Sequence, residues 1–490
     1  MLPKYHPVPH RNTLAAALLA GSALAGVAGD IVKPADGKET KAIIEKAPEA
    51  NPLCFLDGRI CFDVQERLRI EVRNNNFDFD DSLNSFTDDT WLLQRFRVGV
   101  LVKATPWLRI YAQGQDSREF ESDRPNIPGA LAAEGDDNFD LRQAYIEIGN
   151  PKSFPLTLKA GRQLLSYGDE RLIGGFDWNN FGRTFDAAKL SWKAPTWQLD
   201  LFASSVVVIR RDEFNKSDLF NGNENDREQI FSGAYFTMGD LAFGSLELYA
   251  LWLSQANGTT ASLQGAVPTI QPKGAGLLAQ HSSFGTYGGR VKGNPKKLHG
   301  FEFEVEGAYQ NGEVFDQALS AFAVHAGAGY NFDSAWKPRL WAEYNFATGD
   351  KDPADNDSET FQNLFPTNHK FYGIMDLFSW QNMHNPMISL RVSPVKSVTA
   401  QLDYHAFWLA STDDFWYRAN GLTPVRPLTP AARNASNFAG QEVDFVVTWN
   451  ATKWLQVQAG YSHFFAGSYL ADTGPSDDAD FGYLQATINF

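Results

Sequence analysis

The last stretch of the chain, D-F-G-Y-L-Q-A-T-I-N-F at Asp480–Phe490, decides which fold is expected. Apolar side chains stand at every second position, at Leu484, Ala486, Ile488 and Phe490, and groups that tolerate water fill the positions between them. Successive side chains of a β-strand point to opposite faces. The pattern therefore predicts a strand with one apolar face and one wet face.

The chain also stops on an aromatic residue. A terminal Phe490 with apolar residues two, four and six positions earlier resembles the assembly signal of bacterial outer-membrane β-barrels. Soluble β-sandwiches contain alternating strands too, so the rest of the chain must decide between the two classes.

The composition favours a membrane barrel. Of the 490 residues, 13% are aromatic, yet the mean hydropathy is only −0.33. Outside the N-terminus no apolar run reaches the roughly 18 residues that a membrane helix needs. Such a chain suits strands that face lipid on one side and water on the other. The net charge of −15 argues against a nucleic-acid partner.

The N-terminus predicts export. Lys4 and Arg11 precede the short apolar stretch 13–28, which ends in small residues, so we expect residues 1–29 to be a signal peptide. Residues 30–61 are expected to form a periplasmic extension. It ends in C-F-L-D-G-R-I-C, where a tight turn at Asp57-Gly58 would place Cys54 opposite Cys61. An oxidising compartment favours a disulfide there over free thiols, a metal site or a redox pair.

From residue 62 onward the alternating pattern recurs along the whole chain, and it predicts about eighteen strands. Phe62–Asn74 is typical, with apolar residues on one face and charged residues on the other. The further expected strands are Trp91–Ala104, Trp107–Ser117, Phe139–Gly149, Pro155–Ser166, Phe185–Lys193, Trp197–Val207, Glu228–Met238, Phe243–Gln255, Ser282–Lys292, Gly300–Gln310, Ala321–Phe332, Pro338–Thr348, Asn385–Ser393, Val398–Ala410, Gly440–Asn450, Lys453–Phe464 and Ala479–Phe490.

The connections between these strands alternate between short and long. Short ones follow Thr105, Asn150 and Lys193, for example, whereas long ones span residues 118–138 and 349–384. An outer-membrane barrel has short periplasmic turns and long extracellular loops. We therefore expect residues 62–490 to form an all-β, transmembrane antiparallel barrel, large enough for an aqueous channel. The last strand would pair with Phe62–Asn74.

If the apolar positions face lipid, their neighbours face the lumen. An anion beside one lumen cation gains about 4 kcal/mol at an effective dielectric constant of about 20, so a run of them favours anion passage. The alternative is that lumen arginines only brace the wall by pairing with lumen carboxylates such as Glu71, Glu304 and Glu306. The basic residues expected in the lumen by alternation are Arg67, Arg69, Arg73, Arg95, Arg97, Lys103, Arg109, Arg290 and Arg391.

The stretch Gly349–His384 contains too many aromatic residues for a loop that extends into solvent. Its large apolar residues are expected to pack inside the barrel mouth as a constriction or lid. The head of this stretch carries closely spaced carboxylates, for which a solvated tip is expected and Ca²⁺ binding is the weaker alternative. These carboxylates are Asp350, Asp352, Asp355 and Asp357.

Catalysis has little support in the sequence. The nine histidines are scattered, and there is no nucleophile elbow, P-loop or zinc-ligand spacing. His281 and Ser283 would share a strand face, which leaves a lipase-like barrel enzyme as a remote alternative. No cofactor is expected.

Several short motifs resemble the alginate-export outer-membrane porin family. They occur in order along the chain: R-Q-A-Y-I-E from Arg142, K-A-G-R-Q at Lys159–Gln163, F-D-W-N-N-F-G-R-T-F around Trp178, A-T-G-D-K-D at Ala347–Asp352 and G-Q-E-V-D at Gly440–Asp444.

This resemblance implies a monomeric eighteen-stranded barrel, a basic constriction, a loop folded into the pore and passive export of an anionic polyuronate. It also implies that Arg142 and Arg162 belong to the constriction. Strict alternation points both residues toward lipid instead, and a bulge at Gly161 would turn Arg162 inward. We follow the resemblance.

The sequence thus predicts a channel for anions in the bacterial outer membrane, most specifically an exporter of an alginate-type polysaccharide. The expected partners are an anionic polysaccharide or small anions, outer-membrane lipid, the barrel-assembly machinery through Phe490, and periplasmic export components. The alternatives are a general or carboxylate-selective uptake porin, the barrel enzyme, and a closed structural or adhesion barrel.

Overall fold

The computed structural model describes residues 53–83, 88–124, 134–211, 213–217, 229–255, 281–421 and 423–490. The expected signal peptide and most of the N-terminal extension lie outside these ranges, and both remain predictions. Among the described residues, no helix is long and apolar enough to cross a membrane.

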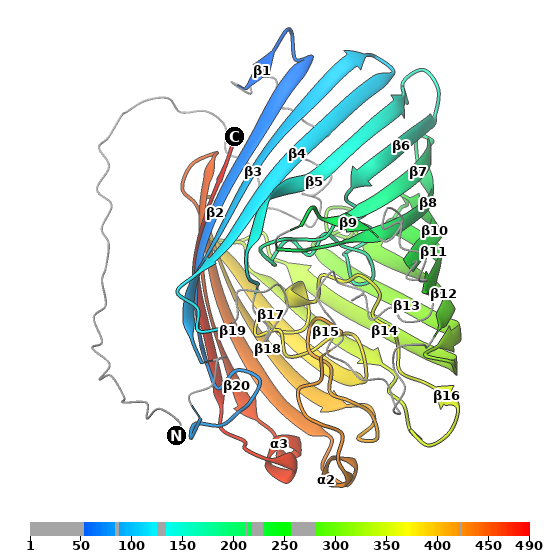
Figure 1. The fold of residues 1–490 in the computed structure, drawn as a ribbon. Helices are drawn as coiled ribbons and strands as arrows, with labels where there is room; N and C mark the ends of the chain where they lie inside the picture. The colour runs from blue at the N-terminus through cyan, green and yellow to red at the C-terminus, as the bar shows by residue number, and fades with distance from the viewer. Residues whose placement is uncertain are drawn as a thin grey trace, which may run out of the picture.

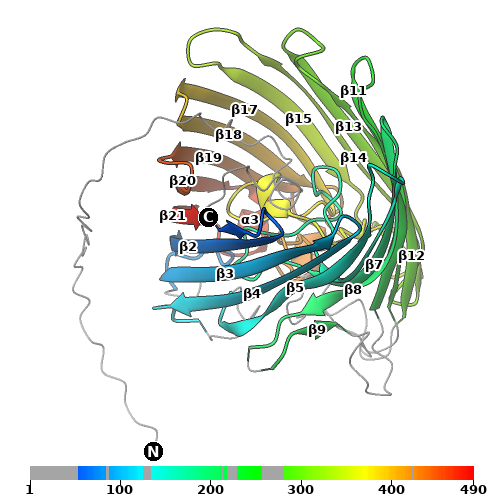
Figure 2. The same cartoon turned by 90° about the horizontal axis from the view of Figure 1, so that it is seen from above.

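Eighteen of the described strands close into one antiparallel barrel, as Figures 1 and 2 show. The predicted fold class is confirmed. The strands of the wall are β2 (Ile60–Asn74), β3 (Thr90–Thr105), β4 (Leu108–Phe120), β5 (Asp137–Gly149), β6 (Leu156–Gln163), β7 (Phe185–Lys193), β8 (Trp197–Val208), β10 (Gln229–Met238), β11 (Gly244–Gln255), β12 (Ser282–Gly293), β13 (Phe301–Val314), β14 (Gln317–Asn331), β15 (Arg339–Ala347), β17 (Met383–Val395), β18 (Val398–Leu409), β19 (Phe438–Asn450), β20 (Leu455–Ala466) and β21 (Ala479–Asn489).

The last strand closes the barrel against the first. β21 pairs with β2 from Gln65↔Asn489 to Asn74↔Asp480. The terminal residue extends this ladder, because Phe490 N donates to Val64 O at 2.9 Å and Phe490 O accepts from Val64 N at 3.2 Å. The closure therefore joins the two segments that the sequence pattern predicted.

The alternation along β2 separates the two faces of the wall. Leu68 and Ile70 are 43% and 45% exposed on the outer face, whereas Arg67 and Arg69 are 3% and 0% exposed on the inner face. The outer face contacts lipid, so its apolar side chains are solvated there without a second protein layer. The arginines must instead find partners inside the barrel.

Short turns join the strands at the end of the barrel that holds the C-terminus, and longer loops join them at the other end, near α2 (Pro430–Arg433) and α3 (Ser468–Thr473) (Figure 1). Two long loops turn into the barrel. We call residues 164–184 the first inner loop and residues 348–382 the second inner loop. The second contains the 3-10 helix η4 (Asn368–Lys370), which lies near the middle of the barrel seen from above (Figure 2).

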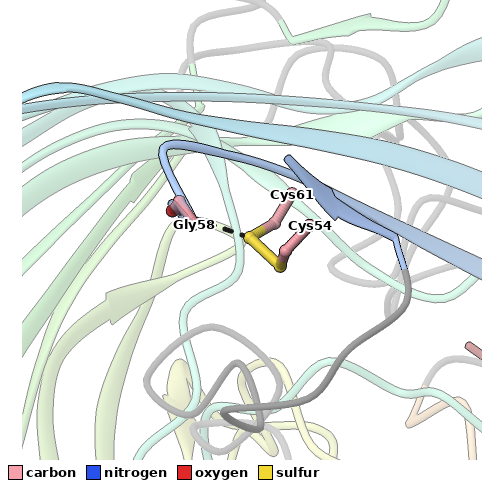
Figure 3. The surroundings of a disulfide bond; sticks show 3 residues. All are labelled: Cys54, Gly58 and Cys61. Carbon is pink, nitrogen blue, oxygen red and sulfur yellow. Dashed lines mark hydrogen bonds between the residues drawn. A yellow bond between two sulfur atoms is a disulfide. The ribbon is translucent and has the colours of Figure 1, made fainter. Parts of the chain in front are cut away.

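A hairpin precedes the wall. The two-residue strand β1 (Cys54–Phe55) pairs with the start of β2 through Cys54↔Cys61 and Phe55↔Ile60, the register expected from the sequence. A disulfide joins Cys54 to Cys61 (Figure 3). Two further two-residue strands, β9 (Lys216–Ser217) and β16 (Asp357–Ser358), belong to the loops.

Candidate functional site

The two inner loops contact each other inside the barrel. Arg183 donates through Nη1 to the carbonyl oxygen of Phe365 at 2.6 Å, and Gly174 N donates to the same oxygen at 2.7 Å. The rings of Trp178 and His369 stack with their centroids 3.8 Å apart. The loops therefore form one body that narrows the lumen.

Two separate strands of the wall hold this body in place. The Glu442 carboxylate of β19 accepts a hydrogen bond from Met375 N at 2.9 Å. Gln310 of β13 donates to Gln362 O at 2.8 Å. The large apolar residues of the second inner loop are all buried, as the sequence predicted: Phe361, Leu364, Phe365, Phe371, Tyr372, Leu377, Phe378 and Trp380.

Four arginines from the wall meet around one carboxylate of the first inner loop, and we call this group the basic cluster. It comprises Arg67, Arg95, Arg97, Arg142 and Asp177. The nitrogen–oxygen distances from Asp177 are 3.1 Å to Arg95, 2.8 Å to Arg97 and 3.6 Å to Arg142. Arg67 donates to the Asp177 carbonyl oxygen at 2.8 Å. The cluster has a formal charge of +3, from four cations and one anion.

The guanidinium groups of the basic cluster are not saturated by the protein. Nε of Arg67, Nε of Arg95 and Nη2 of Arg97 are buried and lack a hydrogen-bond partner among the described residues. The Asp177 side chain is 49% exposed, so solvent reaches its carboxylate, whereas the four arginines are only 1–7% exposed. An anionic oxygen that took the place of the Asp177 carboxylate would meet the same guanidinium donors.

The charge of Asp177 is stabilised by its neighbours. Desolvation would raise the pKa of this carboxyl, but the guanidinium groups around it, Arg95 and Arg97 foremost, hold that pKa well below its usual range. The neighbouring arginines therefore favour the ionised form of Asp177.

Arg69 lies beside the cluster and is paired differently. Its guanidinium contacts Glu71 at 2.6 Å and Glu134 at 2.9 Å, and it lies 3.8 Å above the Trp178 ring. Arg69 thereby fixes the position of the first inner loop, while its own charge is neutralised by two carboxylates.

Arg142 reaches the cluster because of a bulge. The pairing between β4 and β5 passes from Gln113↔Gln143 directly to Gly114↔Leu141, which leaves Arg142 as the extra residue. Its side chain turns inward and donates to Phe181 O at 2.8 Å. Alternation alone pointed this arginine toward lipid.

Arg162 lies apart from the cluster. It is paired in register with Ala144 and Asp186, and its guanidinium binds the Asp186 carboxylate at 2.9 Å. Gly161 before it has φ +121°, and a Cβ there would stand 2.3 Å from Ala144 O, so only glycine fits. Arg162 is buried and binds Asp186, whereas Arg142 binds Asp177.

The remaining basic candidates are spread over the wall. Arg73 contacts Glu71 and Asp376, Arg109 contacts Glu147, and Lys103 is paired in register with Arg109. Arg391 is half-buried and is paired in register with Arg339 and Gln401. None of these contacts involves the Asp177 carboxylate.

Arg290 braces the wall by pairing with lumen carboxylates. This role was the alternative to anion passage for all the lumen arginines. Its guanidinium lies 2.9 Å from Glu304, 3.0 Å from Glu247 and 2.6 Å from Asp169. The wall from β11 to β19 is thus rich in carboxylates, whereas the wall arginines with an unpaired guanidinium nitrogen, among the described residues, lie on β2 and β3.

The acidic head of the second inner loop forms local turns. Asp350, Asp352 and Asp355 each accept a hydrogen bond from the backbone N–H two residues later. Among the described residues, no group of three or more His, Cys, Asp or Glu side chains is placed to hold a metal ion.

Among the described residues, no hydrogen bond joins His281 to Ser283, the lipase-like pair. The His281 ring lies 3.8 Å from Glu313, and Ser283 is paired in register with Ser254 and Glu313. Sequence reasoning missed Asp177, which organises the cluster. Its only signal in the sequence is the F-D-W-N-N motif, which carries part of the family resemblance.

A closed barrel of this size, narrowed by inner loops and lined with charged groups, defines an outer-membrane channel of the porin class. The fold is similar to those of solved Pseudomonas aeruginosa proteins. They include OccK2 (OpdF) in complex with glucuronate, at a TM-score of 0.56 and 10% identity over 88% of this chain and 98% of that one. The outer membrane protein OpdK gives 0.54 and 10%, over 88% and 98%, and OccK11 (OpdR) gives 0.52 and 11%, over 88% and 96%.

The family can be stated more closely. The model of the alginate export family matches residues 59–483, so the chain belongs to that family. A search of curated proteins found no match to this chain.

Proposed function

We propose that this protein passes anionic substrates through the basic cluster, and that an alginate-type polyuronate leaving the cell is its main substrate. The observation that carries the proposal is the group of four arginines around the single carboxylate of Asp177. These arginines already bind one carboxylate, and a uronate carboxylate that displaced the Asp177 side chain would meet the same guanidinium donors.

A polymer suits this arrangement better than a single small anion. Beyond the basic cluster, Arg69 and Arg73 continue the row of inward-facing arginines along β2. Each of them would exchange its present carboxylate partner for a carboxylate of the polymer as the chain passes. Several moderate contacts allow a polymer to enter and leave, whereas one tight site would retain it. Membership of the alginate export family supports the same substrate class.

Planar-bilayer recording tests the proposal. The wild-type channel should be anion-selective, and added polyuronate should reduce its conductance. Arg97→Gln should lower the anion-to-cation permeability ratio at least about twofold, because an under-used cation is removed from the path. Arg433→Gln removes the same charge from an exposed helix end outside the lumen and should leave the ratio unchanged. A cation-selective wild-type channel would refute the proposal.

An uptake porin for small carboxylates is the second candidate. One structural relative was solved with glucuronate, a single uronate. The two functions differ in the size of the preferred ligand. Block by glucuronate at concentrations as low as those of polyuronate, counted per sugar, would favour uptake of the small anion.

A further inference from the structure

The wall has a weak section between β5 and β8. β5 pairs with β6 only through Ala144–Gly149, and the ladder between these two strands does not continue along Asp137–Gln143. β6 has 8 residues and β7 has 9, whereas β3 has 16, so the wall is shorter along the strand direction at β6 and β7. A strand needs about 9–11 residues to cross the membrane.

Side chains close this section in place of a backbone ladder. Asn215, which precedes β9, donates through its backbone N to Asp140 at 2.5 Å and through its side chain to Asp137 at 2.8 Å. Arg162 donates to Leu141 O at 2.9 Å. Behind this seal lies a small cavity lined by residues that include Asn215 and Arg142 of the basic cluster.

An apolar groove of about 460 Å³ lies on the outer face next to the seal. Its outer-face lining includes Phe62, Val98, Ala112, Gly114, Phe139 and Phe214. Phe139 and Phe214 are 59% and 60% exposed, although they are large apolar side chains. The Phe139 ring packs directly over Gly114, where a Cβ would stand 2.1 Å from the ring, so Phe139 forms one wall of the groove.

The groove is continuous with the lipid-facing surface of the barrel, so an acyl chain is the occupant that its position and chemistry fit. Polar groups stand at its extracellular end. Asn138 donates to Arg211 O at 3.1 Å and accepts from Arg118 at 2.8 Å. Arg118 is neutralised by Asp116, whereas Arg211 is exposed and can meet a phosphate.

We propose that this groove binds one acyl chain of a phosphate-bearing membrane lipid, whose headgroup lies at Arg211 and whose chain covers the weak section of the wall. Other acyl chains in the bilayer are equally apolar, so the shape of the groove and the contact with Arg211 must provide the selectivity. The lipid shields the polar seal around Asn215 from the rest of the bilayer.

Native mass spectrometry of the purified full-length chain tests this site. Dioleoyl phosphatidylglycerol and dioleoylglycerol are offered in equal amounts to the protein in detergent micelles. We expect one phosphatidylglycerol to be retained in preference to dioleoylglycerol. Ala112→Phe fills the groove and should reduce retention at least about fivefold, while Ala326→Phe, on the outer face of β14 away from the groove, should not.

Two further variants keep the test decisive. Phe214→Ala changes an exposed residue outside the strands, so it remains informative if Ala112→Phe does not fold, and it should also reduce retention. Arg211→Gln should abolish the preference for phosphatidylglycerol over dioleoylglycerol, and Arg433→Gln should leave it intact. Retention that is absent in the wild type, or unchanged in Phe214→Ala, would overturn the groove assignment. A preference that survives Arg211→Gln would overturn the placement of the headgroup.

Discussion

At the scale of single residues, Asp177 sets the charge of the basic cluster. It supplies one negative charge among four guanidinium groups, and three of these lie within 3.6 Å of its carboxylate oxygens. A loop residue thus occupies the position that a substrate carboxylate would take. The number of cations available to a substrate depends on this one side chain.

Asp177→Asn should therefore raise the anion preference of the channel. The substitution takes the formal charge of the cluster from +3 to +4, while Arg67 and Arg95 still hold the backbone carbonyl of residue 177. The measurement is the reversal potential in a salt gradient, where a shift of several millivolts is expected. Asp240→Asn, at an exposed turn, is the matched control. An unchanged or smaller anion preference would contradict this role for Asp177.

Arg142 and Arg162 show where prediction from sequence reached its limit. Alternation assigned both to the same face, because a period of two cannot register an inserted residue. The bulge at Arg142 turns one of them into the cluster, while Arg162 stays in register with Asp186. The inserted residue in β5 brings Arg142 into the basic cluster, and no local sequence pattern marks the insertion. Asp177 was missed for a related reason, since its partners lie far away in sequence.

At the scale of elements, the second inner loop is held by a close backbone contact. Gly373 has φ +83°, and a Cβ there would stand 2.4 Å from the Glu442 carboxylate. Met375, two residues later, donates its N–H to the same carboxylate. The tip of the loop can lie against β19 only if residue 373 has no side chain.

Gly373→Ala should displace the tip of this loop and widen the lumen. We expect a higher single-channel conductance with normal barrel assembly, judged by heat-modifiable migration on a gel. Gly474→Ala also replaces a glycine of positive φ, at 156°, but its new Cβ would meet only Arg426, at 3.4 Å or more. This control should leave conductance unchanged, and equal effects of the two substitutions would argue against a specific role for the Glu442 contact.

The disulfide hairpin is an element that the wall does not need for closure. β21 and the hairpin lie one after the other along the same edge of β2. Val64 pairs with Phe490 at the end of β21, and two residues earlier Phe62 N donates to Leu53 O beside β1. A loop this short stabilises by about 2–3 kcal/mol when it is cross-linked. Replacing both Cys54 and Cys61 by serine should leave the barrel heat-modifiable and its conductance normal, while protease cleavage near Asp57 becomes faster. Loss of assembly would show that the hairpin acts earlier, during closure.

At the scale of the whole molecule, the positions of the strands could be predicted from the sequence, but the distribution of charged groups around the lumen could not. Lipid outside and water inside impose a period of two on every strand, so the alternation reports the environment directly. The net charge of −15 describes the chain as a whole, whereas the lumen has a basic side around Arg95 and a carboxylate-rich side around Glu304. This partition depends on which loop folds against which wall.

The partition predicts a strong dependence of substrate block on salt. Charges exposed to the lumen are screened over about 10 Å at 0.1 M salt but over about 3 Å at 1 M. A polyuronate held by the basic cluster should therefore need at least about tenfold more polymer for half-block at 1 M than at 0.1 M KCl. A neutral dextran of similar size enters without charge contacts, so its effect on conductance should not change with salt. If polyuronate and dextran showed the same salt response, steric entry rather than the arginines around Asp177 would govern passage.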